Sequence, residues 1–213
     1  MDEPLGQHGP GHRCVIGQAD VDSRAVEGAR LEAWIEQARD DRPGAWAHLY
    51  RLHYDDVYRY VLYLQGDDGA NAEDLAQETF VRARRGIAGY RGQASFSTWL
   101  HRIAINVVRR HWRRSSAQQR TAEGFAWATE QRRAPSPEDV HADATRARAL
   151  LTALEELPPK LREAFVLRDL VGMPPREAAR LLEISPGHLA VRSHRARAKL
   201  HSVLAERGWA GGS

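Results

Sequence analysis

A row of arginines follows one side of the segment 98–114, whose apolar residues recur with helical spacing. The apolar side chains gather on one side at 100° per residue: Leu100, Ile103, Ala104 and Val107. Roughly opposite, at steps of i, i+4, i+7 and i+11, lie Arg102, Asn106, Arg109 and Arg113. No acid occurs between Ser95 and Gln119, so the row is either a solvated basic face or a surface for an anion. Because arginine binds phosphate and asparagine can hydrogen-bond a base edge, we favour a helix that faces DNA.

The segment directly before this helix combines an arginine with small and aromatic side chains. Its candidates for contact with DNA are Arg91, Gln93, Ser95 and Phe96. Such a loop can hold an extruded base, with backbone groups reading the base edge and aromatic rings packing nearby. The alternative is that Phe96 and Trp99 only pack a helical bundle, and for Trp99 we favour that alternative.

A helix-turn-helix pattern occupies the C-terminal part of the chain. A helix over 174–183 is followed by a short turn and by a second helix from about 186 to 205. Ser185 is a suitable N-cap, and Pro186 loses no hydrogen bond at the first helical position. The expected buried side of the second helix is Leu189, Ala196, Leu200 and Val203.

The second helix of this pattern carries the candidates for contact with duplex DNA. They are His188, Ala190, Val191, Arg192, His194 and Arg195. Ala190 and Val191 can touch only thymine methyl groups, so polar readout from the outward face depends on His194 and Arg195. An ordinary exposed histidine remains the alternative interpretation of His194.

Acidic residues near position 70 could bind a divalent metal in a small hydrolase: Asp67, Asp68, Glu73, Asp74 and Glu78. No histidine lies at ligand spacing near them, and the first turn of a helix attracts acids for electrostatic reasons. His8, His12 and Cys14 would supply three ligands, whereas a structural zinc site needs four. The sequence therefore predicts neither a metal nor another cofactor.

Composition narrows the class of protein. The chain has 213 residues, and 31 basic against 28 acidic residues give a net charge of +3. The sequence pI of about 9.3 favours a nucleic-acid partner. The apolar runs are too short to span a membrane, the first ten residues do not resemble a secretory signal, and a single cysteine excludes an internal disulfide. These features predict a cytoplasmic protein.

Helical periodicity and its interruptions predict an all-α fold with two small bundles joined by a flexible linker. In the first bundle, the helix after Asn71 is expected to bury Ala72, Ala76, Phe80, Ala83 and Ile87. The expected organisation is a flexible extension over 1–28, a first bundle over 29–114, a linker over 115–141, a second bundle over 142–206 and a tail over 207–213. The linker also contains Phe125 and Trp127, which a passive spacer would not need.

Four motifs resemble the extracytoplasmic-function (ECF) sigma factors of bacterial RNA polymerase, in the sigma-70 family. Residues 71–83 (NAEDLAQETFVRA) and 95–106 (SFSTWLHRIAIN) are similar to the second sigma domain. Residues 157–165 (LPPKLREAF) and 193–197 (SHRAR) are similar to the fourth sigma domain. The resemblance covers about 29–114 and 142–206, and it implies a non-enzymatic promoter-specificity subunit without catalytic residues.

The resemblance also implies partners and roles. Core RNA polymerase, through its beta and beta-prime subunits, would be bound by a polar face consisting of Glu73, Asp74, Gln77 and Glu78. Arg91–Phe96 and Asn106 would hold a flipped base of the minus-ten promoter element, and the helix from 186 would read the minus-thirty-five element. The linker would thread toward the RNA exit path, and an anti-sigma factor is a further implied partner.

The chain departs from the family pattern at several positions. Family members often have glycine where this chain has Glu183, an aspartate at Arg110, and Thr, Lys and Ser at His188, Ala190 and Val191. These differences predict a minus-thirty-five preference that depends more on apolar contact and DNA shape than is usual in the family. A stand-alone helix-turn-helix regulator is the competing interpretation, but it leaves the acidic helix and the aromatic loop without a role.

Overall fold

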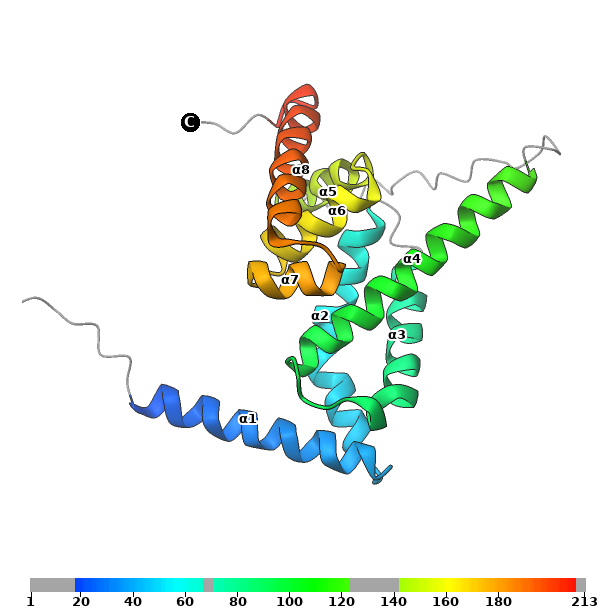
Figure 1. Ribbon diagram of the computed structural model, residues 1–213. Helices are drawn as coiled ribbons and strands as arrows, with labels where there is room; N and C mark the ends of the chain where they lie inside the picture. The colour runs from blue at the N-terminus through cyan, green and yellow to red at the C-terminus, as the bar shows by residue number, and fades with distance from the viewer. Residues whose placement is uncertain (1–17, 67–70, 123–141, 210–213) are drawn as a thin grey trace, which may run out of the picture. The chain divides into compact units, whose positions relative to one another are not determined.

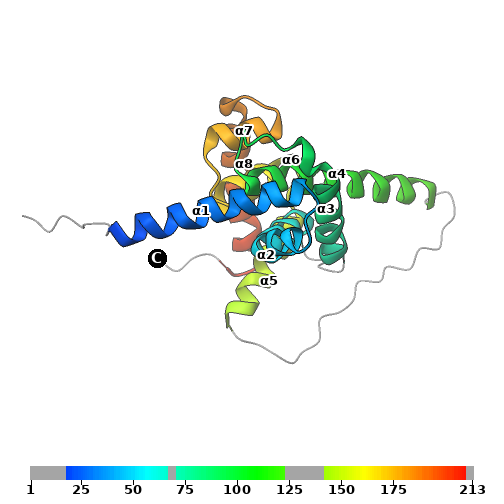
Figure 2. The ribbon, with the colours of Figure 1, turned by 90° about the horizontal axis from the view of Figure 1, so that it is seen from below.

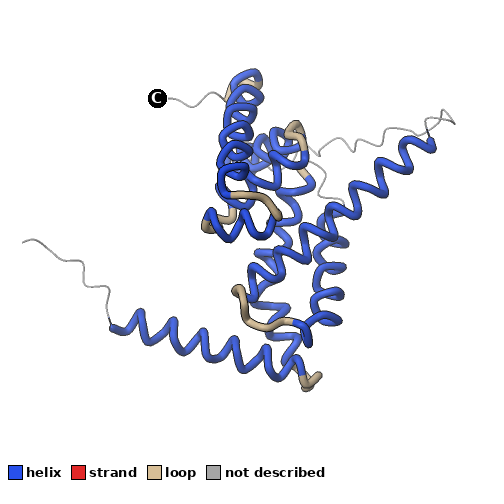
Figure 3. Tube along the Cα trace, viewed as in Figure 1, coloured by secondary structure: helices blue, strands red, loops and turns tan. Residues whose placement is uncertain are grey.

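The computed structural model describes residues 18–66, 71–122 and 142–209, and in these residues all regular structure is helical (Figure 3). The chain divides into two compact units, residues 1–49 and residues 50–213. In the described ranges no helix is both long and apolar enough to cross a membrane.

The first unit contains α1 (Gln18–Arg39) and the start of α2 (Ala45–Gln65). Trp34 stacks on His48 with a centroid separation of 4.8 Å, and the guanidinium of Arg30 lies 5.0 Å from the Trp34 ring centroid. Helix α1 includes residues 18–28, for which the sequence predicted a flexible extension. That segment has no strong helix breaker before Gly28, but its apolar residues do not share one face, so the periodicity argument failed there.

The second unit begins with three helices that we call the N-terminal bundle (residues 50–66 and 71–122). It consists of the rest of α2, α3 (Ala72–Gly86), a short 3-10 turn (Ile87–Gly89) and α4 (Phe96–Ala122). Helix α3 buries four of the five residues expected from its sequence and also Leu75 and Thr79, while the fifth, Ile87, is buried in the 3-10 turn. The Tyr50 ring packs against Phe80 at 4.7 Å, which joins α2 to α3.

Helix α4 continues to Ala122, beyond the expected end at 114. The predicted linker therefore begins with helical residues, and its two aromatic residues, Phe125 and Trp127, lie outside the described residues. The part of the sequence from Ser115 to Ala122 contains no glycine or proline, so nothing local ends the helix at Arg114.

The C-terminal bundle (residues 142–209) has the expected helices. They are α5 (Ala142–Glu155), α6 (Pro159–Phe165) with a π-helical continuation (Val166–Leu170), α7 (Pro175–Leu182) and α8 (Pro186–Glu206) (Figure 1). Helix α8 packs against α5, α6 and α7. Its buried side chains are Leu189, Ser193, Ala196 and Leu200. Val203, which was expected in this row, is only half-buried because it lies near the end of α8.

Candidate nucleic-acid interface

The loop before α4 is held in shape by its own hydrogen bonds. The Tyr90 hydroxyl donates to the carbonyl oxygen of Ala94 at 2.7 Å and closes the loop. Ser95 Oγ accepts from the Thr98 backbone N–H at 3.1 Å, as an N-cap does. Gly92 has a φ of +70°, which is a left-handed conformation that favours glycine. Arg91, Gln93 and Ser95 are exposed on this ordered turn.

Phe96 has a different position from its predicted companions in the loop. Its side chain is 2% exposed, and its ring packs against Tyr90, Trp99 and His53 at centroid distances of 5.5, 5.3 and 5.2 Å. In this structure the Phe96 ring therefore supports the loop from inside and does not lie on its outer surface. Trp99 is half-buried in the same cluster, which agrees with the packing role favoured for it.

Beneath the aromatic cluster lies a set of buried polar side chains that sequence reasoning missed. The Tyr60 ring packs against His101 with a centroid distance of 4.5 Å and a tilt of 58°, and no described group accepts from or donates to Tyr60 Oη, His101 Nδ1 or His53 Nε2. Burial lowers the pKa of His101 to about 4, and burial also lowers the pKa of His53 against an opposing effect of Asp56. Isolated histidines among aromatic residues gave no pattern from which this cluster could be predicted.

The predicted DNA face of α4 lies largely at the surface. Arg102, Asn106 and Arg113 are exposed, and Arg109 is half-buried. The core side of α4 is wider than the predicted stripe, because Ile105 and Val108 are fully buried while Ile103 is only half-buried. The helix packs on α3 and also contacts α2 through the Tyr60–His101 ring contact, so side chains on two neighbouring faces are covered.

Acids of the C-terminal bundle meet this face of α4. Arg109 donates from Nε and Nη2 to the two carboxylate oxygens of Glu163, at 2.7 and 2.8 Å. These bonds raise the pKa of Arg109, and the Glu163 side chain is only 4% exposed. Thr98 Oγ1 donates to Glu177 at 2.6 Å, and Figures 1 and 2 show α7 near the first turn of α4. Arg102 lies 3.5 Å from a carboxylate oxygen of Glu183.

A cavity of about 580 Å³ lies next to the Arg109–Glu163 pair. Its lining includes four cationic side chains: Arg109, Arg113, Lys160 and Arg192. Among the described residues that line the cavity, Glu163 is the only acid, and its two oxygens already accept from Arg109. The cavity is therefore positively charged and suits an anion.

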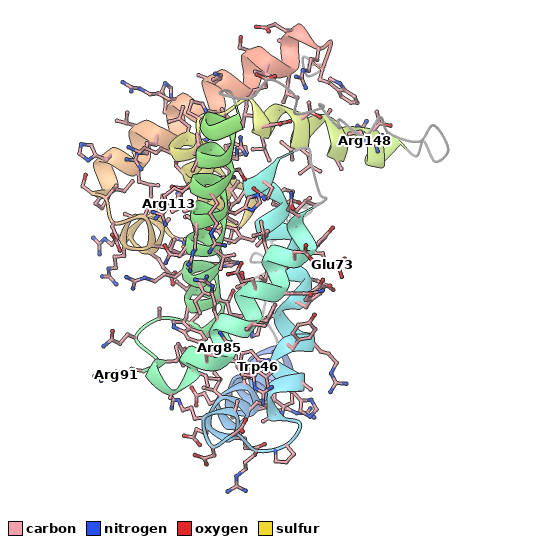
Figure 4. All side chains as sticks on the ribbon, turned by 90° about the vertical axis from the view of Figure 1, so that its right-hand side faces the viewer. Trp46, Glu73, Arg85, Arg91, Arg113 and Arg148 are labelled. Atoms are coloured by element: carbon pink, nitrogen blue, oxygen red, sulfur yellow. The ribbon has the colours of Figure 1, made fainter. Side chains whose placement is uncertain are left out.

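The acidic face of α3 is separate from the arginine face. Glu73, Asp74 and Gln77 are exposed. In Figure 4, Glu73 lies on the side of the view opposite Arg91 and Arg113. Gln77 donates to Glu73 at 3.2 Å, and the half-buried Glu78 pairs with Arg82 at 2.6 Å.

Val81 is an apolar member of the α3 acidic face that sequence reasoning missed. The helical spacing places Val81 in line with Asp74 and Gln77, and it is 50% exposed. A valine among acids interrupts the polar face of an amphipathic helix. This interruption is the signal in the sequence by which Val81 could have been identified.

Helix α8 is capped as expected. Ser185 Oγ accepts from the His188 backbone N–H at 3.2 Å, and Pro186 occupies the first turn. The predicted outward residues are exposed except for the half-buried Arg192. They are His188, Ala190, Val191, His194 and Arg195. Val191 is 48% exposed, so the middle of this surface is apolar.

The described residues contain no group of three or more His, Cys, Asp or Glu side chains placed to hold a metal ion. Of the acids weighed as metal ligands, Asp67 and Asp68 lie outside the described residues, as do His8, His12 and Cys14. Glu73, Asp74 and Glu78 make the contacts given above.

Two family descriptions match the chain in the expected order. Sigma-70 region 2 matches residues 49–118, and sigma-70 region 4 matches residues 147–200. The chain is 35% identical to the ECF RNA polymerase sigma factor SigE of Mycolicibacterium smegmatis over 76% of its own length and 62% of that protein. It therefore spans less than two thirds of this relative.

Two further relatives are covered over more of their length. The ECF RNA polymerase sigma factor BldN of Streptomyces coelicolor is 36% identical over 87% of this chain and 68% of that protein. The RNA polymerase sigma factor CarQ of Myxococcus xanthus is 33% identical over 81% of this chain and 96% of that protein.

Solved structures agree on the fold. The sigma factor RpoE of Bartonella quintana, in complex with the anti-sigma factor NepR, matches with a TM-score of 0.63 and 20% identity over 76% of this chain and 98% of that one. CnrH, in complex with the cytosolic domain of CnrY, matches with a TM-score of 0.59 and 24% identity over 82% of this chain and 96% of that one. The two helical bundles, their order and the similarity to BldN and CarQ together show that this chain belongs to the ECF sigma factors of the sigma-70 family.

Proposed function

We propose that this chain is an alternative sigma factor that binds core RNA polymerase and directs promoter-specific initiation. The observation that carries the proposal is the separation of two oppositely charged faces on one bundle. An acidic face lies on α3, and an arginine face lies on α4 with an ordered loop at its start. A protein that binds only duplex DNA needs the helix-turn-helix but has no use for the acidic face.

The face for core polymerase consists of Glu73, Asp74, Gln77 and Glu78, with Val81 as an apolar contact. An exposed apolar side chain surrounded by charged residues is typical of a protein interface, in which the apolar centre is desolvated and the charges set the orientation. The beta and beta-prime subunits of core polymerase are the proposed partners of this face.

The minus-ten element is proposed to bind at the loop and along α4. Arg91, Gln93 and Ser95 would contact an extruded base on the ordered turn, while the buried Phe96 ring keeps that turn in place. Asn106 would hydrogen-bond a base edge. Arg102, Arg109 and Arg113 would bind phosphates, which sets the register of the strand on the helix.

The minus-thirty-five element is proposed to bind at α8. The exposed Ala190 and Val191 suit apolar contact with thymine methyl groups, whereas His194 and Arg195 supply polar contacts. His188 and Arg192 lie at the start of the helix and at its edge. An anti-sigma factor is a further proposed partner, and it is supported by the RpoE–NepR complex, whose sigma factor shares the fold.

The test is a reconstitution with purified chain, bacterial core RNA polymerase and fragmented genomic DNA from the source organism, followed by sequencing of transcript starts. We expect starts that share one upstream motif, and we expect Asn106→Ala to reduce them strongly. Asn71→Ala is the matched control, because Asn71 is also exposed but lies outside both proposed DNA surfaces. Retained binding to duplex DNA without binding to polymerase would instead support the stand-alone regulator.

A further inference from the structure

We propose that the C-terminal bundle of this chain is an internal competitor of promoter DNA, because its acids occupy the arginine face of α4. This inference rests on the proposed function of that face. The three acids are Glu163 on α6, Glu177 on α7 and Glu183 in the turn of the helix-turn-helix. In the closed arrangement Glu163 and Glu183 lie against two arginines proposed to bind DNA phosphates, and Glu177 accepts from Thr98 at the start of the same helix.

The Arg109–Glu163 pair shows the competition at the level of atoms. Two nitrogens of the guanidinium donate to the two oxygens of one carboxylate, which is the same planar, bidentate geometry with which arginine binds phosphate. Both donors are used, and the carboxylate is almost fully buried. A phosphate can therefore bind Arg109 through this edge only after Glu163 has moved away.

Two weaker contacts extend the competition along α4 toward the loop. Glu177 accepts from Thr98, whose hydroxyl is also 2.8 Å from that of Ser95, one of the proposed base-contacting residues. Glu183 lies beside Arg102. The acids thus contact residues 98, 102 and 109, which spread over about three turns of α4.

The closed arrangement has a second point of contact at the end of α2. Arg162 donates to the carbonyl oxygens of Leu64 and Gln65, each at 2.8 Å, and also to that of Glu155 at 2.7 Å. The guanidinium thus neutralises the C-terminal carbonyls of two helices at once. Gly66 permits this approach, because a Cβ at that position would lie 2.9 Å from the Cβ of Glu155.

Closure also has an electrostatic cost that makes it reversible. Arg113, Lys160 and Arg192 line the same cavity as Arg109, and no hydrogen bond or ion pair with a described residue is found for any of them. Their mutual repulsion opposes closure, and separation of the bundles relieves it. Since a polyanion such as DNA would bind the same cations, closure and DNA binding respond to one set of charges.

The experiment measures closure directly, without polymerase. Spin labels are placed at Arg85→Cys on α3 and His201→Cys on α8, two exposed positions outside the proposed contacts, in a Cys14→Ser background. Pulsed electron–electron double resonance then gives the distribution of distances between the two spin labels, one on each bundle. We expect one narrow distribution for the otherwise unchanged chain and a shift of most molecules to longer, broader distances in Glu163→Gln.

Two further variants separate the acid contacts from a loss of folding. The double variant Glu177→Gln/Glu183→Gln changes acids outside the core and is expected to shift the distribution in the same direction. Glu156→Gln is the matched control, because Glu156 pairs with Arg207 inside the C-terminal bundle and is expected to change nothing. Circular dichroism confirms that each variant keeps its helix content.

Binding of a fluorescein-labelled, mixed-sequence single-stranded oligonucleotide to the free chain supplies the functional readout. Opening is expected to raise its affinity about fivefold in both acid variants and not in the control. Unchanged distances in the acid variants, or opening without any gain in DNA affinity, would overturn the inference. A failed transcription assay with these distance shifts intact would instead contradict the proposed function alone.

Discussion

The guanidinium of Arg162 donates to the carbonyl oxygen of Leu64, a residue 98 positions earlier in the chain, at 2.8 Å. Among the described residues no carboxylate forms an ion pair with Arg162, and burial lowers its pKa despite the opposing effect of Glu155. Its charge is balanced by main-chain carbonyls, which are partial charges fixed in place by two helix ends. The same side chain also lies 5.6 Å from the centroid of the Trp112 ring.

We predict that Arg162→Met destabilises the chain by at least about 3 kcal/mol, because it leaves several buried carbonyl oxygens without a donor. Arg162→Lys is expected to recover only part of this loss, since an ammonium cannot span carbonyls on two helices as the planar guanidinium does. The measurement is urea unfolding followed by circular dichroism. Arg207→Met is the control, and a comparable loss there would contradict the assignment.

Local signals predicted the helices and their exposed faces, whereas contacts between the two bundles were not predictable. Ser185 and Pro186 predict the start of α8 from adjacent residues alone. The spacing of small and aromatic residues in α3 likewise predicts its buried side. Glu163 instead lies in a recognisable motif, but this motif does not predict that Glu163 pairs with Arg109, which is 54 residues away in the chain. Such a pairing depends on how two bundles meet, and no periodicity of one helix encodes it.

Acid pH is expected to destabilise the N-terminal bundle through His101. Burial lowers its pKa in the folded chain to about 4, whereas the unfolded chain has the ordinary value of 6.5. Between these pH values the unfolded state binds a proton that the folded state does not, so stability falls as pH falls from about 6.5 to about 4. The loss attributable to His101 is at most about 3 kcal/mol.

The test compares the free energy of unfolding at pH 7 and pH 5 for the natural chain and for His101→Phe. The phenylalanine keeps an aromatic ring against Tyr60 but cannot bind a proton, so its pH dependence should be smaller. His188→Phe is the control, because His188 is exposed. An identical pH dependence in the natural chain and His101→Phe would show that His101 does not contribute.

The turn of the helix-turn-helix carries measurable backbone strain. Glu183 has a φ of +59° and a ψ of +41°, a left-handed conformation that costs a residue with a Cβ about 1 kcal/mol. Glu183→Gly is therefore expected to raise the free energy of unfolding by about 1 kcal/mol. Arg180→Gly, which lies in α7 itself, should lower stability by a similar amount, and thermal unfolding of both variants checks the two signs.

Promoter choice is expected to depend on the apolar centre of α8. Ala190 is exposed next to the equally exposed Val191, and Ala190→Lys introduces a long cationic donor where only methyl contact was available. We predict that the minus-thirty-five motif upstream of the transcript starts changes while the minus-ten motif stays the same. Lys199→Ala, on the same helix, is the control for a general change in charge. The same upstream motif in the natural chain and Ala190→Lys would contradict apolar readout at this position.

Val81 is the apolar residue within the acidic face of α3, and we expect it to contact core polymerase. A side chain that is half exposed contributes little to folding, but at the centre of an interface its desolvation supplies a large share of the binding energy. Val81→Glu adds charge to a face that is already acidic, and it should weaken binding to core polymerase at least about tenfold without lowering the melting temperature. Leu52→Glu is the matched control, since Leu52 on α2 is 52% exposed and lies outside the proposed face. Fluorescence anisotropy with labelled sigma factor measures both affinities. Equal losses in the two variants would show that added acid alone weakens binding, whereas a loss confined to Val81→Glu places Val81 in the interface.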